Sequence, residues 1–316
     1  SCQTKCVPLQ IVMTKIATIL TVFNRREKTL SCLRHLYEAL EAYNQTVKEG
    51  IALSVFLTDD GCTDGTAEAV RSGFPDKDIR ILQGTGNLFW AGGMRLAWQA
   101  AIDSGTAWDY FLLLNDDTNV YRNVFEELFE ADDYGYQQTG KHGLTSVITC
   151  QPGNPGEVTY GGFIFKSKAK GCHTLAQPMG KPQAVDMTHA NILLVHHNTV
   201  EECGIFYKGF IHGAADEDYS MMAHRRGCPV MTTAHVCGEC ECDHHTSQSE
   251  IEHLMTMPLA ERKRFVNSPT HSDRDYLLFV RRNLPLRYPI AYLLRAVRLY
   301  LPRFYYGITH FRGVYN

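Results

Sequence analysis

Residues 110–118 read YFLLLNDDT, five apolar residues followed by one asparagine and two aspartates. A short and fully apolar run of this kind predicts a strand that is buried on both faces of a sheet. Residues 51–66, IALSVFLTDDGCTDGT, repeat the pattern, because a second apolar run again ends in two aspartates. Residues 16–23 and 79–82 give two further strands. We therefore expect a buried sheet with acidic side chains at the carboxyl ends of its strands.

Helical patterns alternate with these strands. Apolar residues recur every three or four positions from Leu30 to Val47, and Asn24 suits the N-cap of that helix. Residues 64–73 and 92–104 predict two more helices. Alternation of this kind is typical of an α/β fold, with a mostly parallel, Rossmann-like central sheet and helices on both faces.

The second half of the chain is less regular. Residues 158–165 and 192–196 predict strands, and residues 198–203 and 216–226 predict helices. Residues 246–270 are polar and predict a loop or short helices.

These patterns divide the chain into an N-terminal extension over 1–14, an α/β domain over 15–245 and a C-terminal loop with a basic helical extension over 246–316.

The composition fits a globular protein of 316 residues, 44% hydrophobic and 21% charged, with no apolar run as long as a membrane span. The net charge of −3 argues against whole-surface attraction to nucleic acid, so we expect no nucleic-acid partner. The count of eleven cysteines is odd, which predicts mostly free thiols and a cytoplasmic protein. Whether the chain forms a homo-oligomer stays open.

The charge is unevenly distributed. After Asp275 the chain has seven arginines and no acidic residue, while the rest of the chain is acidic. A basic segment rich in leucine and tyrosine can lie on the inner face of an anionic membrane. It can equally form helices that pack on the catalytic domain or on another subunit, and the sequence does not decide between these two interpretations.

The paired aspartates are the strongest chemical signal. Asp59 and Asp60 follow one predicted strand, and Asp116 and Asp117 follow another. Ligands bind at these ends of open α/β sheets, where carboxylates can hold a divalent cation and its phosphate oxygens. A single aspartate after a strand is more often a turn former, but two clusters on neighbouring loops favour a site.

Glycine-rich turns lie between these clusters, at 61–66 and 84–93. Neither is followed by the Gly-Lys-Ser/Thr of a phosphate-binding loop, and the second lacks the third glycine of the dinucleotide fingerprint. A kinase or a nicotinamide-dependent enzyme is therefore disfavoured. The cysteines Cys237, Cys240 and Cys242, with the histidines that follow, have an unusual spacing for zinc. A structural zinc site and an ordinary loop both stay open.

Five motifs occur in order: TVFNR (21–25), TDDGCTDGT (58–66), GNLFWAGGMR (86–95), LLLNDDT (112–118) and HGAADEDYSMMAHRRG (212–227). Together they resemble the family 2 glycosyltransferases with the GT-A fold, especially the rhamnosyltransferase-like and galactofuranosyltransferase-like members of polysaccharide synthesis. The resemblance covers roughly residues 15–245, and it implies a catalytic domain over that range with a nucleotide-binding half, 15–118, and an acceptor half, 119–245.

The resemblance implies a site for a nucleotide-sugar donor. Thr21 and Asp59 match the residues that meet the nucleotide base, and Asn87, Gly93 and Arg95 match the segment that lines the sugar or the pyrophosphate. We assign further members of the site, which are Asn24, Asp60, Trp90 and Asp116.

The resemblance also implies a metal and a base. Asn115-Asp116-Asp117 occupies the metal motif, with Asp117 as a ligand of Mg²⁺ or Mn²⁺, and His244 or His245 completes the metal shell. Asp216 matches the catalytic base of inverting members, although the glutamate that usually precedes it is Ala215 here. Asp218 is the alternative base.

We therefore expect an inverting, metal-dependent hexosyltransferase. It would move a sugar from a UDP or dTDP donor to a glycan or lipid-linked acceptor. Two other classes stay open. One is a catalytically silent nucleotide-sugar-binding or scaffold protein, and the other is a sugar-nucleotide nucleotidyltransferase, which would release pyrophosphate.

Overall fold

The computed structural model of the chain describes residues 13–168, 171–242, 247–271 and 273–311. In that part, the strands are β1 (Thr14–Val22), β2 (Ile51–Asp59), β3 (Ile79–Gln83), β4 (Tyr110–Leu114), β5 (Asn119–Val120), β6 (Leu144–Gln151), β7 (Asn154–Tyr160), β8 (Gly162–Ser167), β9 (Cys172–Leu175), β10 (Gln183–Ala184), β11 (Met187–Thr188), β12 (Ile192–His196) and β13 (Val230–Glu239). The helices are α1 (Arg26–Thr46), α2 (Thr66–Gly73), α3 (Phe89–Asp103), α4 (Val124–Thr139), α5 (His197–Cys203), α6 (Ala215–Arg225), α7 (Ser247–Thr256), α8 (Leu259–Val266), α9 (Asp273–Asn283), α10 (Tyr288–Tyr300) and α11 (Pro302–Phe311). Two short 3₁₀ turns, η1 (Pro269–His271) and η2 (Pro285–Arg287), join the last of these.

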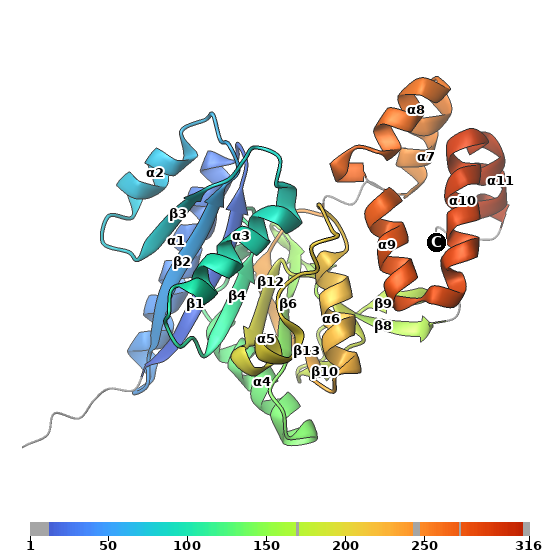
Figure 1. Ribbon diagram of the computed structural model, residues 1–316. Helices are drawn as coiled ribbons and strands as arrows, with labels where there is room; N and C mark the ends of the chain where they lie inside the picture. Colours follow the sequence, from blue (N-terminus) through green and yellow to red (C-terminus); the bar gives the residue numbers. More distant parts are fainter. Residues whose placement is uncertain (1–12, 169–170, 243–246, 272, 312–316) are drawn as a thin grey trace, which may run out of the picture.

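The central sheet has the strand order β10-β13-β6-β12-β4-β1-β2-β3 (Figure 1). Its N-terminal half is parallel, because β1 pairs in parallel with β2 and β4, and β2 with β3. In the second half β12 runs antiparallel between β4 and β6, while β13 returns parallel to β6. A small second sheet has the order β11-β8-β9. The predicted α/β class is confirmed, and the antiparallel strand β12 is the feature that sequence alternation did not reveal.

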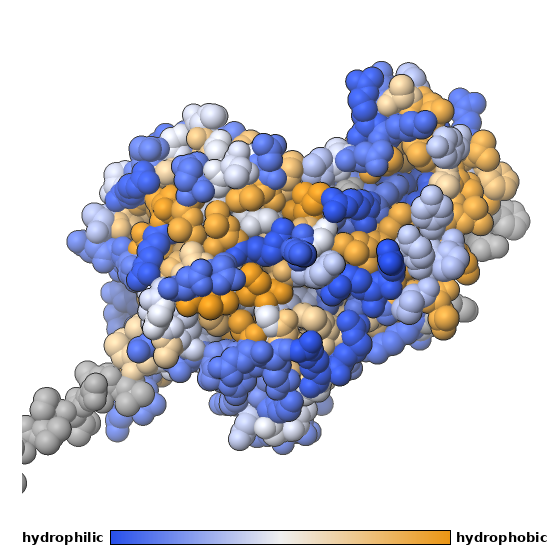
Figure 2. Space-filling view, viewed as in Figure 1, coloured by the Kyte–Doolittle hydropathy of each residue, from blue (hydrophilic) through white to orange (hydrophobic). Residues whose placement is uncertain are grey.

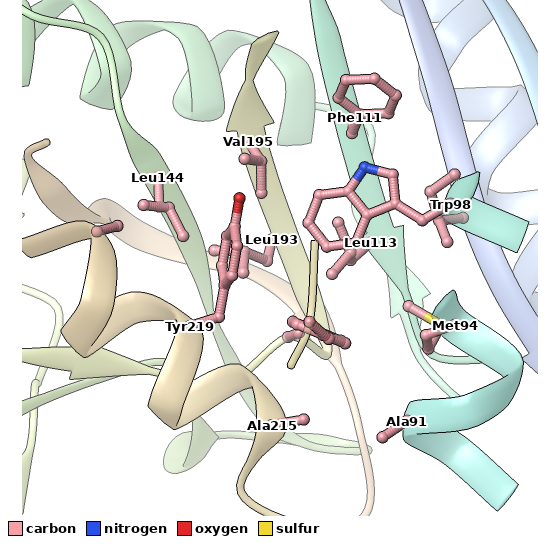
Figure 3. Packing of buried hydrophobic residues seen from close by; sticks show 14 of the residues in the cluster. Ala91, Met94, Trp98, Phe111, Leu113, Leu144, Leu193, Val195, Ala215 and Tyr219 are labelled. Carbon is pink, nitrogen blue, oxygen red and sulfur yellow. The ribbon is translucent and has the colours of Figure 1, made fainter. Parts of the chain in front are cut away.

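Helices cover both faces of the sheet. The strand side chains alternate, so that Ala17 and Ile19 of β1 pack toward α3 and α6, whereas Ile16 and Leu20 pack toward α1 and α4. Figure 3 shows the first of these two cores: Trp98 of α3 and Tyr219 of α6 lie over the sheet, with ring centroids 5.4 Å apart. This packing fixes the two helices whose first turns approach the carboxyl ends of the strands.

Two local predictions are wrong in detail. The helix α1 begins at Arg26 rather than directly after Asn24, because Asn24 takes a left-handed backbone conformation with φ 51° and makes no cap. The strand expected over 158–165 is interrupted at Gly161, so that its two halves join different sheets as β7 and β8.

The C-terminal helices α7 to α11 form a bundle beside the catalytic domain, and α9 packs directly on α6 (Figure 1). Phe279 and Val280 of α9 belong to the same core as Trp98 and Tyr219. Among the helices that the structure describes, none has the length and apolar character needed to cross a bilayer.

Candidate active site

The predicted donor residues meet where β1, β2 and β4 end. Thr21 lies opposite Thr58 in the sheet register, and Val22 lies opposite Asp59. Because β4 also pairs in parallel with β1, the loop that begins at Asn115 emerges at the same edge. The structure therefore brings together three of the five sequence motifs at one end of the sheet, as expected for ligand binding in open α/β folds.

Asp60 holds the loop that leads into α3. Its carboxylate accepts backbone N–H groups of Gly86 at 2.8 Å, Leu88 at 2.8 Å and Phe89 at 3.0 Å. A Cβ at Gly84 would lie 2.6 Å from the Asp60 carboxylate, so only glycine fits there. Asp60 thus shapes the backbone that carries Asn87, whereas Asp59 uses one oxygen for the Cys62 N–H at 2.7 Å.

The N-terminal turn of α3 packs against β1 without intervening side chains. A Cβ at Gly93 would lie 2.0 Å from Thr21 Oγ1, and the Thr58 hydroxyl donates to the Gly93 carbonyl at 2.8 Å. The predicted pair Thr21 and Gly93 is therefore in direct contact. The close approach explains why the sequence has glycine at this helical position, despite the low helix propensity of glycine.

Asn24 joins two site loops. Its Oδ1 accepts the backbone N–H of Thr63 at 2.7 Å, which ties the end of β1 to the loop after β2. Asp64 makes a second link, because its carboxylate accepts the N–H of Arg26 at 3.0 Å. These side chains arrange the walls of the site through backbone contacts.

The Asn-Asp-Asp motif after β4 contains one positioning residue and two buried carboxylates. Asn115 Oδ1 accepts the Trp90 indole N–H at 2.8 Å, which fixes that side chain of α3 beside the motif. The carboxylates of Asp116 and Asp117 are each about nine-tenths buried, and both contact the guanidinium of Arg25. Burial and the charge of Asp117 raise the pKa of Asp116 to about 7.

This pair of carboxylates fits a divalent cation. Two buried and adjacent anions repel each other, and a single cation, here Arg25, contacts both. Carboxylate oxygens are the ligands that Mg²⁺ and Mn²⁺ prefer. Within the described ranges no group of three or more His, Cys, Asp or Glu side chains is arranged to hold a metal. The predicted ligands His244 and His245 lie outside the described residues.

The three nearby thiols have different surroundings. Cys237 of β13 is fully buried in the core, and burial raises the pKa of its thiol. Cys240 lies at the site, where its Sγ is 3.9 Å from Asp117 Oδ1 and 3.4 Å from Asn191 Nδ2. Cys242 is exposed. The thiols do not converge, so the structure gives no support to a zinc site built from all three.

Arg95 and Trp90 contact the protein rather than an open cleft. The Arg95 guanidinium donates to the carbonyls of Tyr207 at 3.3 Å and Phe210 at 2.9 Å. The Trp90 ring packs on Phe206, with centroids 5.4 Å apart. Both residues of α3 therefore hold the segment before α6, in addition to any contact that they make with a ligand.

The three acidic residues at the start of α6 have different partners. Asp216 is buried; its carboxylate accepts the N–H of Ala190 at 2.8 Å and that of Glu217 at 3.0 Å, and burial raises its pKa. Burial and the charge of Asp216 raise the pKa of Glu217 to about 8. Asp218 accepts from Arg282 at 2.8 Å and Asn283 at 2.7 Å.

These contacts separate the roles of the three carboxyl groups. Asp218 faces α9 and joins the C-terminal bundle to α6, because Arg282 and Asn283 both donate to its Oδ1. Asp216 faces the sheet instead: Ala190 is followed by Asn191, whose carbonyl accepts the N–H of Asn115 at 2.9 Å. Asp216 is therefore linked to the metal motif through a single short segment.

Asp275 of α9 was not predicted as a site residue. Its buried carboxylate accepts the N–H groups of Ile211 at 3.2 Å, His212 at 2.8 Å and Gly213 at 3.2 Å. These three residues directly precede the left-handed turn at Ala214, where φ is 60°, and the start of α6. No motif spacing connects Asp275 with a loop more than sixty positions earlier. Arg25 was likewise missed as a partner of the acidic pair, although it ends the first motif.

Comparison with known proteins agrees with this architecture. Residues 18–140 match the sequence model of the family described as glycosyl transferase family 2. Comparison with curated protein sequences gives no match.

Solved structures resemble the chain over most of its length. S. aureus TarS 1–349 in complex with UDP has a TM-score of 0.56 at 11% identity, with 95% of this chain and 92% of that chain covered. The mannosyltransferase PcManGT from Pyrobaculum calidifontis, in complex with GDP-Man and Mn²⁺, has a TM-score of 0.51 at 16% identity, with 95% and 79% covered. At such low identity these likenesses establish the fold.

The fold and the family match together define a glycosyltransferase with the GT-A architecture. Residues 18–140 match the model of glycosyl transferase family 2, and this range contains four of the five motifs that carry the sequence resemblance.

Proposed function

We propose that the protein is an inverting glycosyltransferase that uses a nucleotide-sugar donor and a divalent cation. The observation that carries the proposal is the position of two kinds of carboxylate. Asp116 and Asp117 lie at the end of β4, and Asp216 is linked to the same loop through Ala190 and Asn191. A metal motif for a diphosphate and a base for an acceptor hydroxyl thus lie on two sides of one site.

The donor would bind across the ends of β1, β2 and β4. Thr21 and Asp59 would meet the nucleotide base, with Asn24 and Asp60 shaping the loops around it. Asn87, Gly93, Trp90 and Arg95 would line the sugar or the pyrophosphate. The two similar structures are complexes with UDP and with GDP-Man, which supports a nucleotide-sugar donor. From the sequence resemblance we favour UDP or dTDP.

Mg²⁺ or Mn²⁺ would be held by Asp117 with help from Asp116, together with His244 or His245. Such a cation neutralises negative charge that develops on the leaving diphosphate. The Mn²⁺ bound in the similar mannosyltransferase structure supports this choice. Arg25, which contacts both carboxylates, supplies positive charge at the same point from the chain itself.

Asp216 would act as the base. It takes the proton of the acceptor hydroxyl as that oxygen bonds to the anomeric carbon, while the bond from this carbon to the diphosphate oxygen breaks on the opposite side. Burial raises the pKa of Asp216, which strengthens its carboxylate as a base. Its two backbone N–H partners orient the carboxylate, and each oxygen retains a lone pair for the proton.

The acceptor would be a glycan or a lipid-linked glycan of cell-surface polysaccharide synthesis, as in the members that the sequence resembles. Asp218 is a weaker candidate for the base, because Arg282 and Asn283 already occupy its carboxylate.

A ligand panel tests the proposal. We would measure the thermal midpoint with UDP, dTDP, GDP and CDP, each with and without Mn²⁺, because a ligand that binds only the folded state raises the midpoint. We expect a Mn²⁺-dependent shift that disappears in Asp117→Ala and persists in Asp76→Ala, which changes an exposed aspartate away from the site. No shift with any nucleotide would contradict the proposal. Release of pyrophosphate in place of a nucleoside diphosphate would favour a nucleotidyltransferase.

A further inference from the structure

The C-terminal bundle presents a row of large apolar side chains to solvent. Leu286 of η2 is 94% exposed, and Ile290 and Leu293 of α10 are 59% and 62% exposed. These three residues follow one another at spacings of four and three, so they share one side of the chain. Leu301, which directly precedes α11, is 57% exposed, and Phe304 of α11 is 60% exposed. We call these five residues the apolar row.

The side of α10 opposite the apolar row is well packed, because Ala291 and Arg298 are buried there. Arg298 contacts Glu250 at 2.9 Å and Asp273 at 2.7 Å, which anchors α10 to α7 and α9. The helix is therefore held firmly on one side while its other side exposes leucine and isoleucine, as in helices that lie on a membrane or a partner.

The charges around the apolar row are positive. No acidic residue occurs after Asp275. Three of the arginines in that segment are paired inside the protein, because Arg282 contacts Asp218, and Arg295 and Arg298 contact Asp273. This corrects the simple expectation of a uniformly basic tail.

Other cations stay at the surface of the bundle. Arg281 and Arg303 are exposed, and Lys263 lies over the ring of Tyr300, at 5.7 Å from its centroid. The helix α8 contributes Arg264 as a further exposed cation, while α7 and α8 expose two acids, Glu252 and Glu261. The exposed charges of the bundle are thus mainly positive. Figure 2 shows the apolar surface over α10 and α11 next to hydrophilic surface of the same bundle.

We propose that η2, α10 and α11 dock on an anionic lipid bilayer, with the apolar row inserted among the lipid chains and Arg281, Arg303 and Lys263 at the headgroups. Exposed leucine and isoleucine side chains gain by leaving water, and cations near an anionic surface gain electrostatically. None of the described helices can span a bilayer, so the contact would be interfacial. This inference does not depend on the proposed reaction, because it uses no residue of the candidate active site.

The test is flotation of the full chain with vesicles of phosphatidylcholine alone and of phosphatidylcholine with phosphatidylglycerol. We expect the protein to float with the anionic vesicles and to bind at least about tenfold more weakly in the double variant Leu286→Asp/Leu293→Asp. Both side chains are exposed, so the fold should tolerate the change, and a thermal melt checks this. Met179→Asp is the matched control, because Met179 is 63% exposed and lies outside the bundle.

A second variant tests the cations. Arg281→Glu/Arg303→Glu should reduce binding to anionic vesicles and make the remaining binding less sensitive to salt. The proposal is overturned if the wild-type chain stays with neither vesicle, or if Leu286→Asp/Leu293→Asp floats as well as wild type. It is equally overturned if light scattering shows a dimer without vesicles that the same double variant dissociates, because the row would then bind a second copy of the chain.

Discussion

The two sides of the candidate active site are held in place by different means. On the donor side, Asp60 fastens the loop before α3, and Thr21 contacts Gly93 directly. These partners lie within the first hundred residues, although Trp90 and Arg95 of α3 also contact residues 206–210. On the base side, the loop before α6 is held by Asp275, from a helix that begins after residue 272. The donor side is thus locally encoded, whereas the base side depends on the C-terminal bundle.

Asp216→Asn should give the largest difference between the two sides of the site. Because the amide cannot take a proton from the acceptor, we expect kcat to fall by about 10²–10⁴-fold. The nucleotide-dependent thermal shift should persist, since the donor side is unchanged. Steady-state kinetics with product analysis measures the effect. Asp218→Asn is the comparison variant, and a larger loss there than in Asp216→Asn would mean that our choice of base is incorrect.

Asp275→Asn should separate the two sides further. The amide cannot accept three backbone N–H groups as the carboxylate does, so the loop before α6 should shift and kcat should fall by roughly ten- to a hundredfold. Donor affinity should stay at the wild-type value, which a purely destabilising change would not achieve. Asp273→Asn, in the same helix, removes the contacts with Arg295 and Arg298 instead. Equal losses of kcat in the two variants would argue against a positioning role for Asp275.

Asp60→Ala should measure how much the Asp60 carboxylate stabilises the loop before α3. Three backbone N–H groups lose their acceptor, and a buried donor left unsatisfied costs about 1–3 kcal/mol of unfolding free energy. Urea unfolding measures the loss, and we also expect weaker nucleotide binding because the loop carries Asn87. Asp76→Ala should leave both quantities unchanged. A wild-type stability in Asp60→Ala would show that the loop does not need this carboxylate.

Glu217 should change how the stability of the folded protein depends on pH. Its pKa is about 8 in the folded protein, against an ordinary value of 4.5. The folded state therefore binds this proton more tightly, so the contribution to stability is present below pH 4.5 and is lost as pH rises through about 8. Glu217→Gln carries no such proton, and the variant should lose less stability than wild type over this range. Parallel stability curves for the two proteins would contradict the assignment.

The signals from which we predicted the donor side are short-range. The apolar runs that end in Asp59 and in Asn115 predict strands, and strands of a parallel sheet end at one edge. The glycines at 84 and 93 are visible in the sequence, but the collisions that require them, with Asp60 and Thr21, are tertiary contacts. The roles within the motifs were harder to predict: Asp60 and Asn24 bind backbone groups, which a motif match does not distinguish from contact with a ligand.

The basic C-terminal segment, which forms α9 to α11, shows the opposite case, because its sequence did not predict how it packs. The sequence left its basic segment open between a membrane surface and a packed helix pair. The structure shows that helix α9 packs on α6, while η2, α10 and α11 leave their apolar row exposed. The packed-helix interpretation is thus confirmed for α9, whereas the membrane interpretation stays a proposal for η2, α10 and α11. Helical spacing could not separate the two interpretations, because Arg281 and Arg282 are neighbours in the sequence. Only the packing of α9 shows that Arg282 contacts Asp218 while Arg281 is exposed.

The sequence by itself determined the α/β class and the edge of the sheet at which the acidic strand ends meet, because apolar periodicity and acidic strand ends are local properties of the chain. Only the tertiary structure decided how the acids at the start of α6 are used, since buried partners from distant segments occupy or orient each carboxylate. Asp218 meets Arg282, the loop before Asp216 meets Asp275, and Asp216 meets Ala190. Contacts between residues this far apart follow from packing, which spacing along the chain does not encode.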